Sequence, residues 1–224
     1  MKRSSGIEFL AVTVLGLVFY LPFLSIQYDP NGLVEAMSVE TGQLLNKNHM
    51  LYRPLGSFVW RALQVAGYNG NSLIVLQVIN AVAGAVGLGF AYLAFKRISG
   101  DRSAACIGAL FLGTSFTYWV SATDVFYVTV AGMFAAAALA CVLYAQSVRW
   151  IVAAGVLTAM SIFTWQGSLF LLPALPILLP TNKRTFRGVA AFAGTAGLLV
   201  GIVYVVAAFA SRGVMGPRDL WMWF

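Results

Sequence analysis

The sequence of 224 residues contains very little charge, because Asp, Glu, Lys and Arg make up only 9% of it while 60% is hydrophobic. Soluble globular proteins carry about 25% charged residues, so the composition excludes that class. Cysteine is nearly absent too. Cys106 and Cys141 both lie inside apolar stretches, which indicates packing thiols and excludes a disulfide framework or a cysteine metal pair. With a mean hydropathy of +0.85, the chain is an integral membrane protein.

The net charge of +7 arises from basic residues that gather in short connectors between apolar stretches. No basic stripe is interleaved with stacking aromatics, so no nucleic-acid partner is expected. Short connectors rich in Lys and Arg stay on the cytoplasmic side. This cytoplasmic set comprises Lys2, Arg3, Lys96, Arg97, Arg102, Arg149, Lys183, Arg184 and Arg187. The outer set comprises Lys47, Arg53, Arg61, Arg212 and Arg218. We therefore expect a bacterial-type inner membrane or plasma membrane, with the N-terminus cytoplasmic and the C-terminus outside.

The apolar stretches predict an all-α fold, a polytopic membrane helix bundle of about seven membrane segments in a single transmembrane domain, 1–224. The stretches are approximately 9–27, 73–95, 104–119, 125–145, 150–163, 168–180 and 188–209. A helix needs about 20 residues to span a bilayer. The first stretch is long enough and lacks a small-residue cleavage site, which favours an uncleaved helix over a signal peptide. The pair 150–163 and 168–180 is shorter, and its polar tip 164–167 is expected to end in a cavity below the outer surface.

The segment 28–72 is the one sizeable polar part of the chain and is expected to form an outer loop. Apolar residues mixed with acids predict an interfacial helix over roughly 33–45. Apolar residues at three- and four-residue spacing, beginning at Leu55 after Pro54, predict a second interfacial helix over roughly 54–66. Between them lie the only histidine of the chain, His49, and Arg53. A functional and a structural role for His49 are both open. Arg53 suits a phosphate or simply lipid headgroups.

Two carboxylates follow apolar stretches on the outer side. Asp29 comes directly after the first stretch, and Asp124 lies in the turn between 104–119 and 125–145. Ionisable groups at that depth are costly to hold and mark functional sites by default. Because both acids emerge on one side of the membrane, we expect them to converge. The structural alternative is that each acid caps a helix end.

Together these features resemble the GT-C superfamily of membrane glycosyltransferases, especially the protein-mannosyltransferase and aminoarabinose-transferase-like branch. The resemblance rests on the topology and on four strings in order: Asp29, then His49-Met50-Leu51-Tyr52-Arg53-Pro54-Leu55-Gly56, then Tyr118-Trp119…Asp124…Tyr127, then Thr164-Trp165-Gln166…Pro173. It covers nearly the whole chain but only the N-terminal part of such an enzyme. From this we expect a chain that is truncated at its C-terminus.

The resemblance implies an inverting transfer of a sugar from a polyprenyl-phosphate donor to an acceptor on the outer face. Asp29 would be the base and Asp124 the second catalytic acid. Asp124 would position the acceptor or, with Asp29, help to hold a divalent metal; metal dependence stays open. The resemblance places the substrate among His49, Tyr52, Arg53, Trp119, Tyr127, Trp165 and Gln166. The partners would be the lipid-linked sugar, membrane lipids and an acceptor that the sequence does not identify.

Three alternatives stay open. A transporter or channel subunit would suit the acids at the rim and the short broken helices. Against it, no Asp, Glu, Lys, Arg or His lies inside an apolar stretch after Glu8. A purely structural membrane protein would not need an outer loop with Asp, His and Arg. The third alternative is an inactive fragment of a glycosyltransferase.

Overall fold

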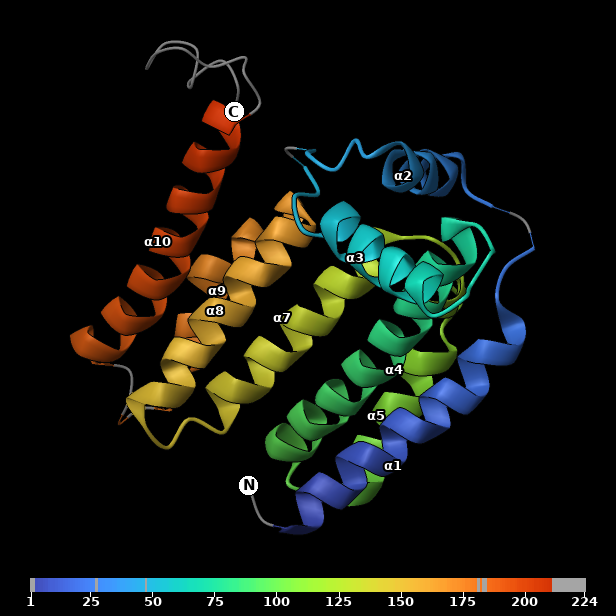
Figure 1. Ribbon diagram of the computed structural model, residues 1–224. Helices are drawn as coiled ribbons and strands as arrows, with labels where there is room; N and C mark the ends of the chain where they lie inside the picture. The colour runs from blue at the N-terminus through green and yellow to red at the C-terminus, as the bar shows by residue number, and fades with distance from the viewer. Residues whose placement is uncertain (1–2, 27, 47, 181, 183–184, 211–224) are drawn as a thin grey trace.

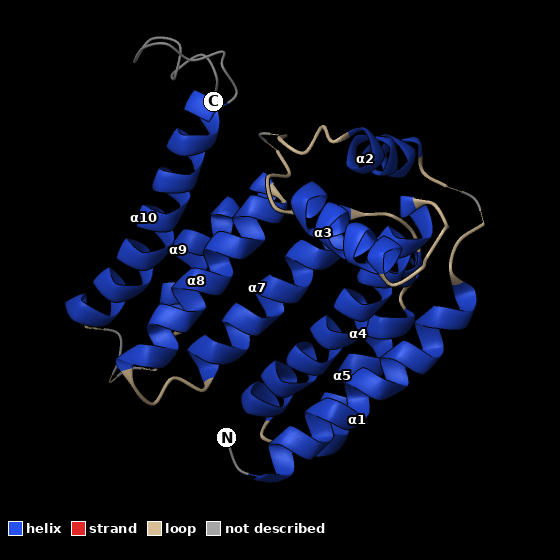
Figure 2. Ribbon diagram, in the orientation of Figure 1, coloured by secondary structure: helices blue, strands red, loops and turns tan. Residues whose placement is uncertain are grey.

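The computed structural model describes residues 3–26, 28–46, 48–180, 182 and 185–210. Within these ranges the chain forms ten α-helices and two short 3-10 helices, with no strand (Figure 2). The prediction of an all-α fold is confirmed. Lys47 and Lys183, expected on opposite sides of the membrane, lie outside the described residues.

The helices follow one another closely along the chain (Figure 1). They are α1 (Arg3–Tyr20), η1 (Leu21–Phe23), α2 (Pro30–Thr41), α3 (Tyr52–Val65), α4 (Ser72–Ser99), α5 (Arg102–Thr114), α6 (Phe116–Thr123), α7 (Tyr127–Leu143), α8 (Val148–Thr164), η2 (Gln166–Phe170), α9 (Leu171–Ile177) and α10 (Phe186–Ala210).

Three of these helical stretches are long and apolar enough to cross a membrane: Ser5–Phe23, Ser72–Ser99 and Phe186–Ala210. A fourth is added if α5 and α6 count as one span, although they meet at an angle of 62°. The stretch expected as one straight span over 104–119 is thus broken at Ser115. The apolar helices α7, α8 and η2–α9 are shorter. The protein therefore has the helices of a membrane protein.

Helix α4 is the centre of the bundle and packs against α1, α5, α6 and α7. Small residues make these close approaches possible. A Cβ added at Gly84 would lie 2.7 Å from Cβ of Ala122 on α6. Likewise, a Cβ at Gly155 of α8 would lie 2.9 Å from the backbone oxygen of Phe192 on α10. The small residues of the sequence therefore serve helix packing.

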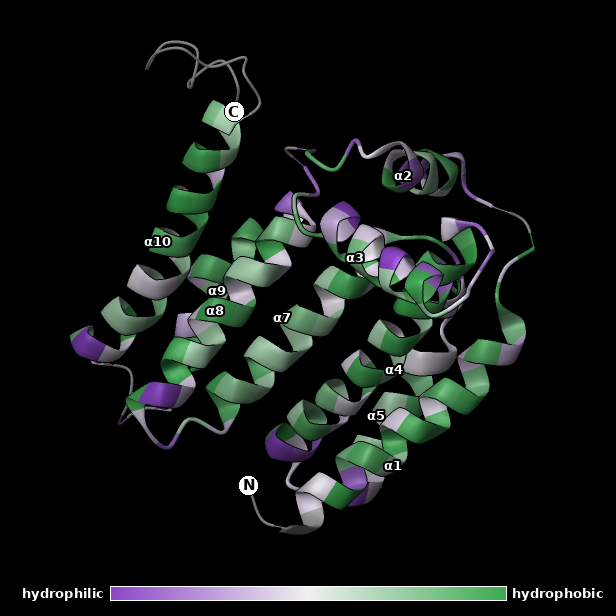
Figure 3. Cartoon of the chain, viewed as in Figure 1, coloured by the Kyte–Doolittle hydropathy of each residue, from purple (hydrophilic) through white to green (hydrophobic). Residues whose placement is uncertain are grey.

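The end of the bundle that holds the N-terminus carries an ionic cluster. The Glu8 carboxylate of α1 pairs with Lys96 of α4 and with Arg102 of α5, whose Nη2 lies 3.0 Å from Glu8 Oε1. Tyr92 also donates a hydrogen bond to Glu8 (3.0 Å). Hydrophilic residues colour this end of the helices in Figure 3. Lys96 and Arg102, two members of the predicted cytoplasmic set, thus lie together at this end.

Helices α2 and α3 lie across the opposite end of the bundle (Figure 1) and both pack against α4. The prediction of two helices in this loop is confirmed, with shifted bounds. Helix α2 starts earlier than expected, at Pro30, because Asp29 caps it. It ends at Thr41, and the residue that caps it there, Gly42, has a φ of 78°, which favours glycine. Helix α3 starts at Tyr52, so that Pro54 falls within its first turn, where no intrahelical N–H is required.

Candidate functional site

Asp29 stands at the junction between the first span and the loop that covers the bundle. Its backbone is extended, and its Oδ1 accepts a hydrogen bond from the Asn31 backbone N–H at 2.7 Å. Aspartate is a favoured N-cap and proline a favoured first helical residue, so Asp29-Pro30 starts α2 on local grounds. The capping alternative therefore holds for Asp29. Within the described part of the chain its second oxygen, Oδ2, has no hydrogen-bond partner.

Asp124 contacts Asp29, although the two residues are 95 positions apart in the sequence. It follows α6 directly, and its carboxylate is held by two backbone N–H groups. Oδ1 accepts from Val125 at 2.7 Å, and Oδ2 accepts from Asp29 at 3.3 Å. The residue is 7% exposed. The predicted convergence of the two acids is confirmed, because the Asp124 carboxylate contacts the backbone of Asp29.

The two carboxylates line one cavity of about 410 Å³ at the end of the bundle that α2 and α3 cover. Its other walls are aromatic, apolar or hydroxyl-bearing. The described residues that line it are Tyr28, Asp29, Phe116, Thr117, Val120, Ser121, Asp124 and Phe126. None of these described residues is Lys, Arg or His. Such a cavity suits a ligand with several hydroxyl groups and apolar ring faces, and its acids can take up a proton or hold a cation.

Two amide side chains on α4 hold this end of the site in place. Asn80 is fully buried; it donates to the Asp124 backbone oxygen (2.6 Å) and accepts from the Tyr52 hydroxyl (3.3 Å). Gln77 donates to the Ser25 backbone oxygen at 2.8 Å. Neither was singled out from the sequence. The sequence does contain a signal for them, because two amide side chains stand one helical turn apart within the apolar stretch 73–95.

His49 lies in a neighbouring cluster rather than in the cavity wall. Its ring stacks on Tyr127, with centroids 3.5 Å apart. Tyr127 stacks on Phe126, which lines the cavity, at 5.6 Å. The Nδ1 atom of His49 lies 3.4 Å from the Thr164 backbone oxygen. Burial lowers the pKa of His49, while the nearby Glu35 carboxylate opposes that shift. His49 thus backs the cavity through two aromatic side chains.

Arg53 is engaged in a buried ion pair. Its Nε and Nη2 atoms each lie 2.9 Å from a carboxylate oxygen of Glu35, and Nη1 donates to the Gln43 backbone oxygen at 3.3 Å. Arg53 is 8% exposed and Glu35 4% exposed. This pair joins α2 to α3. The adjacent Tyr52 is fully buried, and burial raises the pKa of its hydroxyl well above the ordinary value. Neither Arg53 nor Tyr52 lines the cavity.

The remaining predicted site residues lie outside the cavity lining as well. Trp119 packs its ring against Phe23, with centroids 6.3 Å apart. Its buried indole N–H has no hydrogen-bond partner among the described residues. Trp165 and Gln166 follow α8, and Gln166 interacts with Tyr204 of α10. The loop contacts the end of α8 next to this tip, where the Leu51 N–H donates to the Phe163 backbone oxygen at 3.0 Å and His49 lies against the Thr164 backbone oxygen.

The structure therefore divides the predicted site into two parts. Asp29 and Asp124 share the cavity, whereas His49, Tyr52, Arg53 and Tyr127 form a buried cluster beside it. No family model, curated protein or solved structure matches the chain.

Proposed function

We propose that this protein is a membrane glycosyltransferase of the GT-C type. It would transfer a sugar from a polyprenyl-phosphate donor to an acceptor on the outer face, inverting the anomeric carbon. The observation that carries the proposal is the contact between Asp29 and Asp124, two acids far apart in sequence that line one cavity at the end of an apolar bundle. A donor with a lipid tail accounts for a site in this position.

The proposed topology has seven membrane segments: α1, α4, the bent pair α5–α6, α7, α8, η2–α9 and α10. Helices α2 and α3 would lie in the outer interface. The ionic cluster of Glu8 with Lys96 and Arg102 at the end opposite α2 and α3 supports a cytoplasmic N-terminus. The amphipathic α3 supports an interfacial position, because Leu55 and Val59 face the α4 side while Arg61 is exposed.

The environments of the two acids support different roles. Both oxygens of Asp124 accept hydrogen bonds from backbone N–H groups, so this carboxylate is fixed and suits positioning of the acceptor. Asp29 is partly exposed and is capped through Oδ1 alone. Its Oδ2 would take the proton of the acceptor hydroxyl as that oxygen bonds to the anomeric carbon. The bond from this carbon to the phosphate oxygen breaks in the same step, and the polyprenyl phosphate leaves as an anion.

The departing phosphate needs positive charge nearby, and the part of the lining that the structure describes holds no basic residue. The side chains present fit a divalent cation, because Mg²⁺ is commonly held by one or two carboxylates together with substrate phosphates and water. Asp124 would be its protein ligand, which leaves Oδ2 of Asp29 free to act as the base. Within the described residues no group of three or more His, Cys, Asp or Glu side chains is suited to a metal. When bound, such an ion would neutralise the charge on the phosphate.

The aromatic side chains beside the carboxylates would bind the sugar and the adjoining part of the donor. Phe126 lines the cavity, and Tyr127 and His49 stack behind it in turn. We propose that Arg53 orders the loop through Glu35 instead of contacting the phosphate directly, because both its carboxylate-facing nitrogens are already paired.

The proposal is tested by following labelled sugar from a polyprenyl-phosphate donor to acceptors in membranes that contain Asp29→Asn. Asparagine caps a helix about as well as aspartate, so α2 should be retained while the base is lost. Loss of a general base typically slows turnover by about 10²–10⁴-fold. Asp101→Asn is the matched control. Asp101 caps α5 through the Ala104 N–H at 2.6 Å and lies outside the cavity lining. Full transfer by Asp29→Asn would refute the mechanism.

A further inference from the structure

A second cavity adjoins the one that holds the carboxylates. It has a volume of about 280 Å³ and lies between the α5–α6 bend and α7. Its lining is Leu112, Ser115, Thr117, Tyr118, Ser121, Val128, Thr129 and Gly132. Thr117 and Ser121 also line the carboxylate cavity. The two cavities therefore adjoin at these two residues of α6, and we call the second one the α6 groove.

The walls of the α6 groove present carbon surface although several of its residues carry hydroxyl groups. Ser115 donates to the Leu112 backbone oxygen (2.7 Å), Tyr118 to that of Gly84 (2.7 Å), and Thr129 to that of Ser121 (2.5 Å). These hydroxyl groups are already satisfied by the backbone. A polar ligand would gain little from such walls, whereas a hydrocarbon chain needs no hydrogen bonds from them.

The junction between the two cavities is different. The hydroxyl groups of Thr117 and Ser121 make no hydrogen bond within the described part of the chain. These two residues line both the carboxylate cavity and the α6 groove. Across them the order is thus a carboxylate-bearing head site, then two available hydroxyl groups, then an apolar groove. This order matches a charged or sugar-bearing head, a phosphate and a hydrocarbon chain.

We infer that the α6 groove binds the first isoprene units of a polyprenyl phosphate, with its phosphate at Thr117 and Ser121. The inference rests on the proposed function for the head group in the carboxylate cavity. The bend of 62° between α5 and α6 opens the groove, and Gly132 leaves room for the chain, because a Cβ added there would meet nothing within 4 Å.

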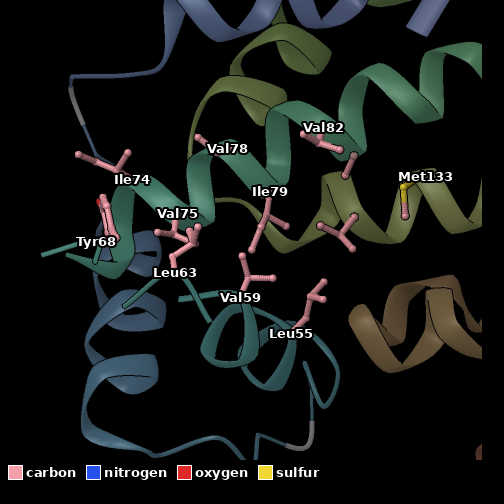
Figure 4. A pocket seen from close by; sticks show the side chains of 12 residues that line it. Leu55, Val59, Leu63, Tyr68, Ile74, Val75, Val78, Ile79, Val82 and Met133 are labelled. Atoms are coloured by element: carbon pink, nitrogen blue, oxygen red, sulfur yellow. The ribbon is translucent and has the colours of Figure 1, made fainter. Parts of the chain in front are cut away.

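A larger apolar groove of about 420 Å³ lies beneath α3, between that helix, α4 and α7. Figure 4 shows its side chains, among them Val59 of α3 and Val82 of α4. It shares no lining residue with the carboxylate cavity. The cavity that holds Asp29 and Asp124 thus adjoins the α6 groove, through Thr117 and Ser121, and does not adjoin the groove beneath α3.

The test uses the purified full chain in nanodiscs and a polyprenyl phosphate that carries a photoactivatable group on its first isoprene units. Crosslinked peptides are located by mass spectrometry. We expect them within residues 112–132. Gly132→Phe should fill the groove, and each methylene kept out of an apolar site costs about a fourfold loss of affinity. Exclusion of a few methylenes should therefore weaken crosslinking at least roughly tenfold.

Two matched controls separate filling the groove from general damage. Gly197→Phe places the same side chain on α10, at a position where a Cβ also meets nothing within 4 Å. Val82→Phe adds bulk to the groove beneath α3. Both should crosslink like the wild type. Gly132→Leu is a milder filling variant that keeps the test valid if Gly132→Phe does not fold.

The outcomes distinguish this inference from the proposed function. Crosslinks in 112–132 that are lost in the Gly132 variants support the groove even if no sugar transfer is found. Crosslinks beneath α3, crosslinks that the Gly132 variants leave unchanged, or a wild type that does not crosslink would each overturn it. The last three outcomes leave a transfer that depends on Asp29 untouched, because that assay measures the base.

Discussion

The buried pair of Glu35 and Arg53 gives the sharpest prediction about the loop that covers the site. Three hydrogen bonds from one guanidinium tie together Glu35 of α2, Gln43 just beyond it and Arg53 of α3. The side chains are only 6% and 10% exposed for Glu35 and Arg53. Replacing one partner leaves the other charge buried without compensation, which costs about 3–5 kcal/mol.

We therefore expect Glu35→Gln and Arg53→Met to destabilise the packing of α2 on α3 to a similar extent. A local loss of about 3 kcal/mol corresponds to exchange that is faster by roughly 10²-fold. Hydrogen exchange of residues 30–65 in nanodiscs, followed by mass spectrometry, measures it. The double variant Glu35→Met/Arg53→Met removes both charges and should recover much of the loss. Arg61→Met, on the exposed side of α3, is the matched control.

The same variants separate ordering of the loop from phosphate binding by Arg53. If Arg53 contacted the donor phosphate, Glu35→Gln would free the guanidinium and strengthen donor binding, while Arg53→Met would weaken it. Ordering of the loop predicts that both variants weaken binding. Opposite effects on donor binding, or exchange rates no different from those of Arg61→Met, would refute the reasoning.

Two further predictions concern the cluster behind the cavity. Burial lowers the pKa of His49, so the folded protein holds its proton less tightly than the unfolded chain. The docking of residues 48–53 should therefore be complete above the ordinary pKa of about 6.5 and weaken as the pH falls towards the lowered value. Hydrogen exchange of these residues at pH 8 and pH 5 measures this effect. His49→Gln should remove the dependence of the exchange on the protonation of residue 49. Asn80→Leu leaves the Asp124 carbonyl and the Tyr52 hydroxyl without their amide partner, at about 1–3 kcal/mol for each unsatisfied group. Thermal unfolding in detergent measures that loss, and a melting temperature equal to that of the exposed-site control Gln146→Leu would contradict it.

The sequence predicted those features that depend on local chemistry. The spacing of Leu55 and its apolar neighbours identified α3. The positions of Asp29 and Asp124 after apolar stretches led to the prediction that the two acids converge. The bend at Ser115 was missed, although Gly113, Thr114 and Ser115 interrupt the apolar stretch 104–119 where the helix breaks.

Features that join distant residues were harder to predict. Glu35 and Arg53 are 18 residues apart and lie on different helices, so neither helical spacing nor charge pattern pairs them. Arg53 was therefore expected to meet a phosphate, and its pairing follows only from how α2 packs on α3. Asn80 was overlooked for a related reason. A single amide in an apolar helix acquires its role from the Asp124 carbonyl that tertiary packing brings to it.

The central claim is that Asp29 and Asp124 face one cavity that opens on the outer side of the membrane. Its most direct test places cysteines at both positions, Asp29→Cys and Asp124→Cys, in a chain whose Cys106 and Cys141 are replaced by Ala. A short, membrane-impermeant bifunctional thiol reagent is then added from outside. We expect a crosslink between positions 29 and 124, and none in a control that pairs position 29 with Asp101→Cys. Failure of the first pair to crosslink, although each single cysteine reacts, would contradict the shared cavity. Labelling from the cytoplasmic side alone would contradict the outward opening.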